Sequence, residues 1–226
     1  MSLTRRLIGE AIGTAFLLAA IVGSGIMAVR LAGGNDALAL LCNSTATGAI
    51  LVVLIVVFAP ISGAHLNPAV TMAFLFRREI GFLLALAYVA SQIFGAVIGT
   101  WTTHLMFDQS ILQISTKARL SSGIWIAEVI ATFGLILTIF GTRQWRAEWV
   151  AVTVGLYIAS AYWFTASTSF ANPAVTIARS LTDTFAGIEP LHVPAFILAQ
   201  IGGAIIGTVV SAWLYSSAQL SLSVQE

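Results

Sequence analysis

The sequence predicts an all-α membrane protein with six transmembrane helices, two re-entrant half-helices and an inverted repeat of three helices. Three observations predict this fold. Of the 226 residues, 58% are hydrophobic and only 8% are charged, against roughly 25% charged residues in a soluble domain. Long apolar windows recur along the whole chain, and the tetrapeptide Asn-Pro-Ala-Val occurs twice between them.

Composition also excludes several classes of function. Ten Lys and Arg against nine Asp and Glu leave a net charge of +1, so nucleic acid is excluded as a partner. At about 20 residues per span, six spans use about 120 positions and leave no room for a soluble catalytic domain. No nucleophile triad, phosphate-binding loop or carboxylate pair is present. We therefore expect no enzymatic activity, no cofactor and no metal site. The expected partner of the protein is the lipid bilayer that surrounds it.

The expected spans are apolar windows bounded by charges or turn residues. The first window follows the Arg5-Arg6 pair and is too long for the apolar region of a signal peptide. The six windows are Leu7–Val29, Ala37–Ala59, Gly81–Met106, Ile124–Phe140, Trp149–Thr165 and Val193–Leu214.

An even number of spans places both termini on one side of the membrane. Cationic residues are unequally divided between the two sides, and the positive-inside rule therefore predicts cytoplasmic termini in the cell membrane. The side with the termini holds Arg5, Arg6, Arg77, Arg78, Arg143 and Arg146, whereas the other side holds Arg30, Lys117, Arg119 and Arg179.

Three marks recur in the same order in the two halves of the chain. They are a Glu early in a span (Glu10 and Glu128), the box Asn-Pro-Ala-Val-Thr (67–71 and 172–176), and Gln-x-x-Gly-Ala-x-x-Gly (92–99 and 200–207). Because each half holds three spans, the second half enters the membrane from the opposite side. We expect one transmembrane channel domain over residues 1–226, with repeats at about 5–106 and 122–215.

Each box reads as the start of a half-helix. Asn is a good N-cap and Pro suits the first helical position, so helices begin at Asn67-Pro68 and Asn172-Pro173. A run of roughly ten residues spans about 15 Å, half the hydrocarbon thickness. The irregular segments before the boxes must line a wet cavity. Their carbonyls would accept hydrogen bonds from a polar, uncharged solute, and the two Asn amides would donate.

These motifs resemble the signature loops of the major intrinsic proteins, the aquaporins and aquaglyceroporins. The resemblance covers Arg5 to Leu214. It implies six full helices, two half-helices and a homotetramer with one pore per subunit. It further implies that Glu10 and Glu128 accept hydrogen bonds from their own pore loops, although a proton relay is an alternative. The resemblance assigns the pore motifs to Asn67, Pro68, Ala69, Asn172, Pro173 and Ala174.

His65 lies in the first signature loop. A pH gate and a metal ligand are possible roles. Because no Cys, Asp or second His stands at ligand spacing, we interpret His65 as a pore-loop side chain bonded to the backbone.

The constriction expected from the resemblance departs from the usual family pattern. Most relatives have Arg after the second Asn-Pro-Ala, whereas this chain has Val175. Counting along the chain gives Thr47 and Ser169 as two further positions, and the fourth is Tyr162 or Ser160. This set carries no fixed charge. Arg179, one turn beyond Val175, is interpreted as an anchor at the membrane interface.

The small, uncharged constriction predicts a passive channel for neutral solutes larger than water. Val in place of Arg resembles a bacterial subgroup associated with arsenic resistance, which implies arsenite, antimonite or methylated arsenicals as permeants, with glycerol and water beside them. Two alternatives stay open, a water-selective pore and a proton-coupled secondary transporter with a midplane site.

Overall fold

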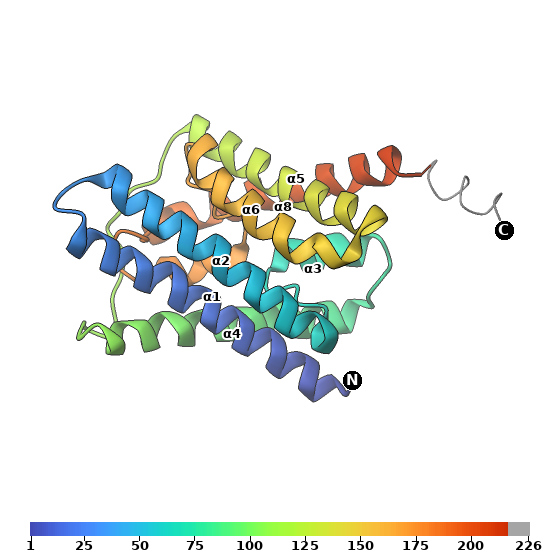
Figure 1. Ribbon diagram of the computed structural model, residues 1–226, viewed down its shortest axis with the longest axis horizontal. Helices are drawn as coiled ribbons and strands as arrows, with labels where there is room; N and C mark the ends of the chain where they lie inside the picture. The colour runs from blue at the N-terminus through green and yellow to red at the C-terminus, as the bar shows by residue number, and fades with distance from the viewer. Residues whose placement is uncertain (217–226) are drawn as a thin grey trace.

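The computed structural model describes residues 1–216 and is all-helical over that range. Long helices run side by side along the molecule, and two short helices, α3 and α7, lie between them (Figure 1). The helices are α1 Leu3–Leu31, α2 Asp36–Ser62, α3 Pro68–Phe76, α4 Phe82–Met106, α5 Ser122–Trp145, α6 Val150–Phe164, α7 Pro173–Arg179 and α8 Val193–Leu214, with 3₁₀ turns at Ala147–Trp149 and Pro190–His192.

Five of the six expected spans are long and apolar enough to cross a membrane, namely α1, α2, α4, α5 and the segment Pro190–Leu214. The expected span Trp149–Thr165 is present as α6, but α6 has only 15 residues, which corresponds to about 22 Å. The 3₁₀ turn Ala147–Trp149 precedes it. The fifth expected span therefore forms a helix that is two residues shorter than its predicted window.

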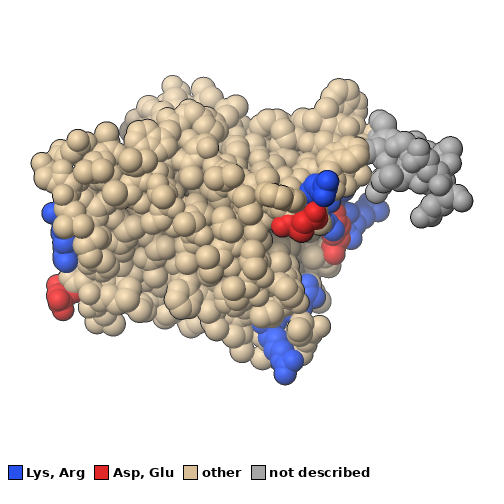
Figure 2. Space-filling model, in the orientation of Figure 1, with Lys and Arg blue, Asp and Glu red and all other residues tan. Residues whose placement is uncertain are grey.

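The two halves of the chain run in opposite directions through the molecule. α1 starts at the end marked N in Figure 1, whereas α5 starts at the opposite end. The last turn of α8 lies at the same end as the N-terminus. On the face seen in Figure 2, charged side chains gather at the two ends and an uncharged surface separates them. This distribution is the one that a bilayer requires of a protein that spans it.

Glycines allow the helices within each half to cross closely. Gly95 and Gly99 of α4 face the backbone carbonyls of Ala11 and Ala15 in α1, and a Cβ at either glycine would collide with them. In the second half, Gly203 and Gly207 of α8 face the backbone of α5 in the same way. These small residues thus let the helices within each half approach closely.

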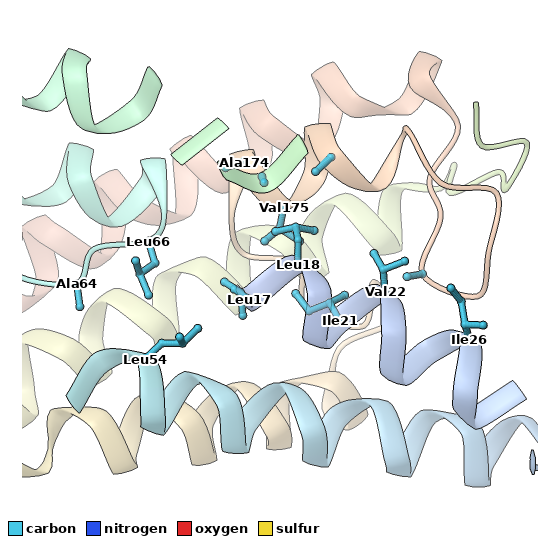
Figure 3. Packing of buried hydrophobic residues seen from close by; sticks show 13 residues of the cluster. Leu17, Leu18, Ile21, Val22, Ile26, Leu54, Ala64, Leu66, Ala174 and Val175 are labelled. Atoms are coloured by element: carbon cyan, nitrogen blue, oxygen red, sulfur yellow. The ribbon is translucent and has the colours of Figure 1, made fainter. Parts of the chain in front are cut away.

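A buried apolar cluster joins the long helices to the loop before α3 and to α7. Leu17, Leu18 and Ile21 of α1 pack with Leu66 and Val175, which come from opposite halves of the chain (Figure 3). The core thus fixes the starts of α3 and α7 relative to α1.

Candidate functional site

The two short helices begin as their sequences predict. The Asn67 side-chain oxygen accepts a hydrogen bond from the Ala69 N–H at 2.8 Å, and Asn172 accepts from the Ala174 N–H at 3.0 Å. A Pro follows each Asn at the first helical position. The N-caps therefore satisfy backbone donors that a helix start leaves unpaired.

Each Asn amide also reaches across to the other half. Asn67 Nδ2 donates to the Ala171 carbonyl at 2.7 Å, and Asn172 Nδ2 donates to the Leu66 carbonyl at 2.9 Å. The expectation that these amides face a solute holds only in part, because one N–H of each is used within the protein. An amide nitrogen carries two hydrogens, so a second donor remains on each side chain.

The loops before the two Asn residues have matching backbone conformations. At four, three and one positions before each Asn, φ is positive, a region that side chains other than Gly rarely adopt. Holding a non-Gly residue there costs on the order of 1–3 kcal/mol. The residues are Gly63 (96°), Ala64 (48°) and Leu66 (48°) in the first loop, and Thr168 (62°), Ser169 (48°) and Ala171 (47°) in the second.

A buried carboxylate holds the first loop in this conformation. Glu10 accepts hydrogen bonds from the His65 N–H at 3.0 Å and the Leu66 N–H at 2.7 Å. Ser62 Oγ donates to it at 2.6 Å and Gln92 Nε2 donates at 2.8 Å. Charge-assisted bonds of this kind are stronger than neutral ones, so Glu10 offsets the backbone strain.

Glu128 stands in the same relation to the second loop. It accepts from the N–H groups of Phe170 and Ala171, both at 2.9 Å, and from Gln200 Nε2 at 2.6 Å. The two N–H groups lie two and one positions before the Asn, as in the first loop. Both carboxylates are buried, and their acceptor positions are occupied by donors of the loop and of the Gln in the last helix of that half.

His65 does not make the contact expected from the sequence. Its imidazole Nδ1 is hydrogen-bonded to the Thr71 hydroxyl, at 3.1 Å, and not to a backbone group. The ring packs against Phe74 and Tyr88. His65 is thus held by side chains of α3 and α4 at the edge of the cavity described next.

One cavity of about 560 Å³ runs past both Asn caps. Asn67 and Asn172 lie in its wall between Arg143 near one end of the molecule and Arg179 near the other. Residues 63–67 and 169–172, from the two strained loops, line part of it. Apolar side chains of the long helices form much of the rest, including Leu17, Ile21, Leu51, Ile55, Leu135 and Ile139.

Four uncharged side chains gather in the part of the cavity beyond Asn172. Thr47, Tyr162, Ser169 and Val175 line it, and the Thr47 and Tyr162 hydroxyls lie 3.3 Å apart. The alternative prediction from α6, Ser160, is wrong, because Ser160 does not line the cavity. It is exposed on the outside of α6, where its hydroxyl donates to the Leu156 carbonyl. Counting residues across a loop could not decide which face of α6 turns inward.

Arg179 is the main correction to the sequence interpretation. It is not an interfacial anchor, because it is only 2% exposed and lines the same cavity as Val175. Its Nε donates to the Ala186 carbonyl, and its Cζ lies 3.4 Å from the centre of the Phe170 ring. A charge is therefore present at this end of the cavity, contrary to expectation. The sequence could have predicted this position, because residues four apart, such as Val175 and Arg179, share a helix face.

A second arginine lies near the same ring without reaching the cavity. Arg119 Cζ is 4.9 Å from the centre of Phe170. Its Nε donates to the Gly187 carbonyl and its Nη1 to the Ser167 carbonyl. Burial lowers the pKa of Arg119 to about 10, so the guanidinium stays protonated at neutral pH and supports the loops around α7.

Inverted halves, paired half-helices capped by Asn, and a cavity that passes both caps define a helical membrane channel rather than an enzyme. The chain belongs to the major intrinsic protein family, whose model matches residues 1–148 and 142–225. It is therefore an integral membrane protein, and the resemblance drawn from its motifs is confirmed.

Several individual proteins are similar over most of the chain. Aquaglyceroporin AqpS of Rhizobium meliloti (strain 1021) is 50% identical over 96% of this chain and 93% of its own length. Glycerol uptake facilitator protein-like 6 of Lactiplantibacillus plantarum is 30% identical over 89% of this chain and 94% of its own length. The X-ray structure of the aquaglyceroporin from Plasmodium falciparum matches with a TM-score of 0.71 at 23% identity, with both chains covered completely, which supports the fold.

Proposed function

We propose that this chain forms a passive channel for small neutral solutes, among them water, glycerol and uncharged metalloid acids such as arsenite, antimonite and methylated arsenicals. The observation that carries the proposal is the cavity that passes both Asn caps and is lined by Thr47, Tyr162, Ser169 and Val175. Val175 stands where the family resemblance puts Arg. A short apolar side chain there leaves the passage wider than a guanidinium would.

The two walls of the cavity suit a hydroxylated solute. Loop backbone and Asn amides offer hydrogen bonds on one side, while leucines and isoleucines offer an apolar surface on the other. Glycerol and arsenous acid each carry three hydroxyl groups and no charge at neutral pH. The names of two relatives, an aquaglyceroporin and a glycerol uptake facilitator, support solutes larger than water.

Cation exclusion follows from the paired half-helices. The N-termini of α3 and α7 meet near Asn67 and Asn172, and each helix start carries roughly half a positive charge. Two such ends together raise the energy of a cation at the centre of the pore. A neutral solute meets no such barrier, which favours uncharged permeants.

We propose the cell membrane as the location, with cytoplasmic termini and a homotetrameric assembly. The excess of cationic residues on the side of the termini supports this orientation. Many apolar side chains on the outer faces of the helices, for example Phe16, Val53, Phe94 and Leu198, are available to lipid and to neighbouring subunits. Reporter fusions at each terminus test the orientation, and native mass spectrometry in detergent tests the tetramer.

Stopped-flow measurements on proteoliposomes test the channel itself. Gradients of water, glycerol, urea and arsenous acid should each relax faster than in empty liposomes, without saturation and with low activation energy. Val175→Arg should cut the permeability to glycerol and arsenous acid more than that to water. Val175→Leu adds bulk without charge and separates the two effects, and Ser160→Ala, outside the cavity, is the matched control. A wild-type protein that passes only water contradicts the wide filter, and saturable uphill flux contradicts the channel.

A further inference from the structure

Within residues 1–216, two residues that line the cavity beyond the Asn caps each have a buried polar atom with no hydrogen-bond partner. Among the residues that the structure describes, neither Arg179 Nη1 nor Ser169 Oγ has a hydrogen-bond partner. Both residues line the cavity beyond the Asn caps, and both are only 2% exposed. Leaving such a group unpaired costs about 1–3 kcal/mol. Each such group therefore calls for an explanation, and a solute or water held in the cavity would supply the missing partner.

The placement of Arg179 brings its charge back toward the filter. Side chains on a helix lean toward the helix N-terminus, so Arg179 covers the preceding turn, which contains Val175. Its stacking on Phe170, a residue of the loop before α7, agrees with that direction. The Ala186 carbonyl accepts from Nε, which holds the plane of the guanidinium and leaves Nη1 for another partner.

Comparison with Arg119 shows that an arginine can support this loop without leaving a donor unpaired beside the cavity. It approaches the same Phe170 ring, but its Nε and Nη1 donate to the Gly187 and Ser167 carbonyls, and it is not among the residues that line the cavity. Loop support is thus supplied by Arg119. The free donor of Arg179 has no equivalent structural use.

We propose that Arg179 is a specificity-determining residue of the pore and that, with Ser169, it forms a subsite for the hydroxyl groups of neutral solutes. This inference rests on the proposed function. The charge that relatives place at the position of Val175 is supplied here from one helical turn further along α7. The pore axis beside Val175 stays wide, while a guanidinium in the wall donates to hydroxyl oxygens and repels cations.

The subsite predicts two separate selectivities. Urea and the guanidinium ion have nearly the same size and planar shape but differ in charge, so the ratio of their permeabilities reports the charge of Arg179. Glycerol and urea are both neutral but differ in hydroxyl groups, so the second ratio reports hydroxyl binding. Both ratios are measured by stopped-flow on proteoliposomes at equal protein content.

Arg179→Leu should raise the guanidinium-to-urea ratio at least tenfold and lower the glycerol-to-urea ratio severalfold. Arg179→Lys keeps the charge without the planar donor, so it should keep the exclusion of guanidinium and lose the preference for glycerol. Ser169→Ala should lower only the glycerol-to-urea ratio, by about twofold to threefold. Arg30→Gln, which removes an exposed cation bonded to the Phe107 carbonyl at the same end of the molecule, should change neither ratio.

Unchanged ratios in well-folded Arg179→Leu protein overturn the proposal. If that variant fails to fold, Arg179→Lys and Ser169→Ala decide, because an unchanged glycerol-to-urea ratio in both also overturns it. Wild-type protein that passes neither glycerol nor urea contradicts the proposed function itself. Wild-type protein that passes both, with variants that do not differ from it, contradicts only the subsite.

Discussion

Replacing Glu128 by Gln tests whether the carboxylate holds the second pore loop. The carboxylate accepts the Phe170 N–H on one oxygen and the Ala171 N–H on the other. A Gln amide has only one oxygen, so in either orientation its NH₂ group faces a backbone N–H. Gln200 can turn its amide to adapt, since Gln200 Oε1 has no partner within residues 1–216, but a backbone N–H cannot.

The expected cost follows from these contacts. One buried N–H left unpaired costs about 1–3 kcal/mol, and the remaining N–H bond loses about 1 kcal/mol when its acceptor becomes neutral. The sum is a loss of about 2–4 kcal/mol in the free energy of unfolding. Because Ser169 and Ala171 occupy a strained backbone region, the loop should relax and the solute permeability should fall as well.

Equilibrium unfolding in mixed micelles, followed by tryptophan fluorescence, measures the free energy, and stopped-flow measures the permeability. Asp108→Asn is the matched control, because Asp108 is exposed in the loop after α4 and its neutralisation should change neither quantity. A Glu128→Gln protein that loses less than about 1 kcal/mol and conducts like the wild type would refute the reasoning, since it would show that the loop keeps its conformation without the carboxylate.

Three further predictions test the fold and the pore. Gly99→Val should destabilise the protein by about 1–3 kcal/mol or more, because the new Cβ would collide with the Ala15 carbonyl. Gly202→Val is the control, since a Cβ at Gly202 meets no atom within 4 Å, and it should have little effect in the same thermal unfolding assay. Asn172→Ala loses a cap worth about 1–2 kcal/mol and the bond to Leu66, so it should cost more stability and permeability than Asn35→Ala, an exposed cap on α2. Glu10→Gln should impair folding or conductance without altering any dependence on a proton gradient; proton-driven uphill flux that this change abolishes would favour a transporter.

The half-helices could be predicted because their signals are local. Asn followed by Pro specifies an N-cap and a first helical position whatever the tertiary surroundings, and both half-helices start as expected. Inversion of the second half follows from counting spans, which needs no knowledge of packing. The expected window Trp149–Thr165 differs from α6 by one residue at each end, because hydropathy does not show that Trp149 closes a 3₁₀ turn before the helix starts at Val150.

The wall of the cavity could not be read so directly, because it depends on which face of each element turns inward. Ser160 and Tyr162 are two positions apart on α6, so they lie on different faces, and only packing decides that Tyr162 meets Thr47. Arg179 illustrates the same limit with a larger consequence. From sequence, a charged residue near the end of a half-helix is typical of an interface, and burial of its guanidinium is costly unless it is compensated. The compensation comes from Phe170 and Ala186, which lie before and after α7 and become neighbours of Arg179 only once the loops on both sides fold around it.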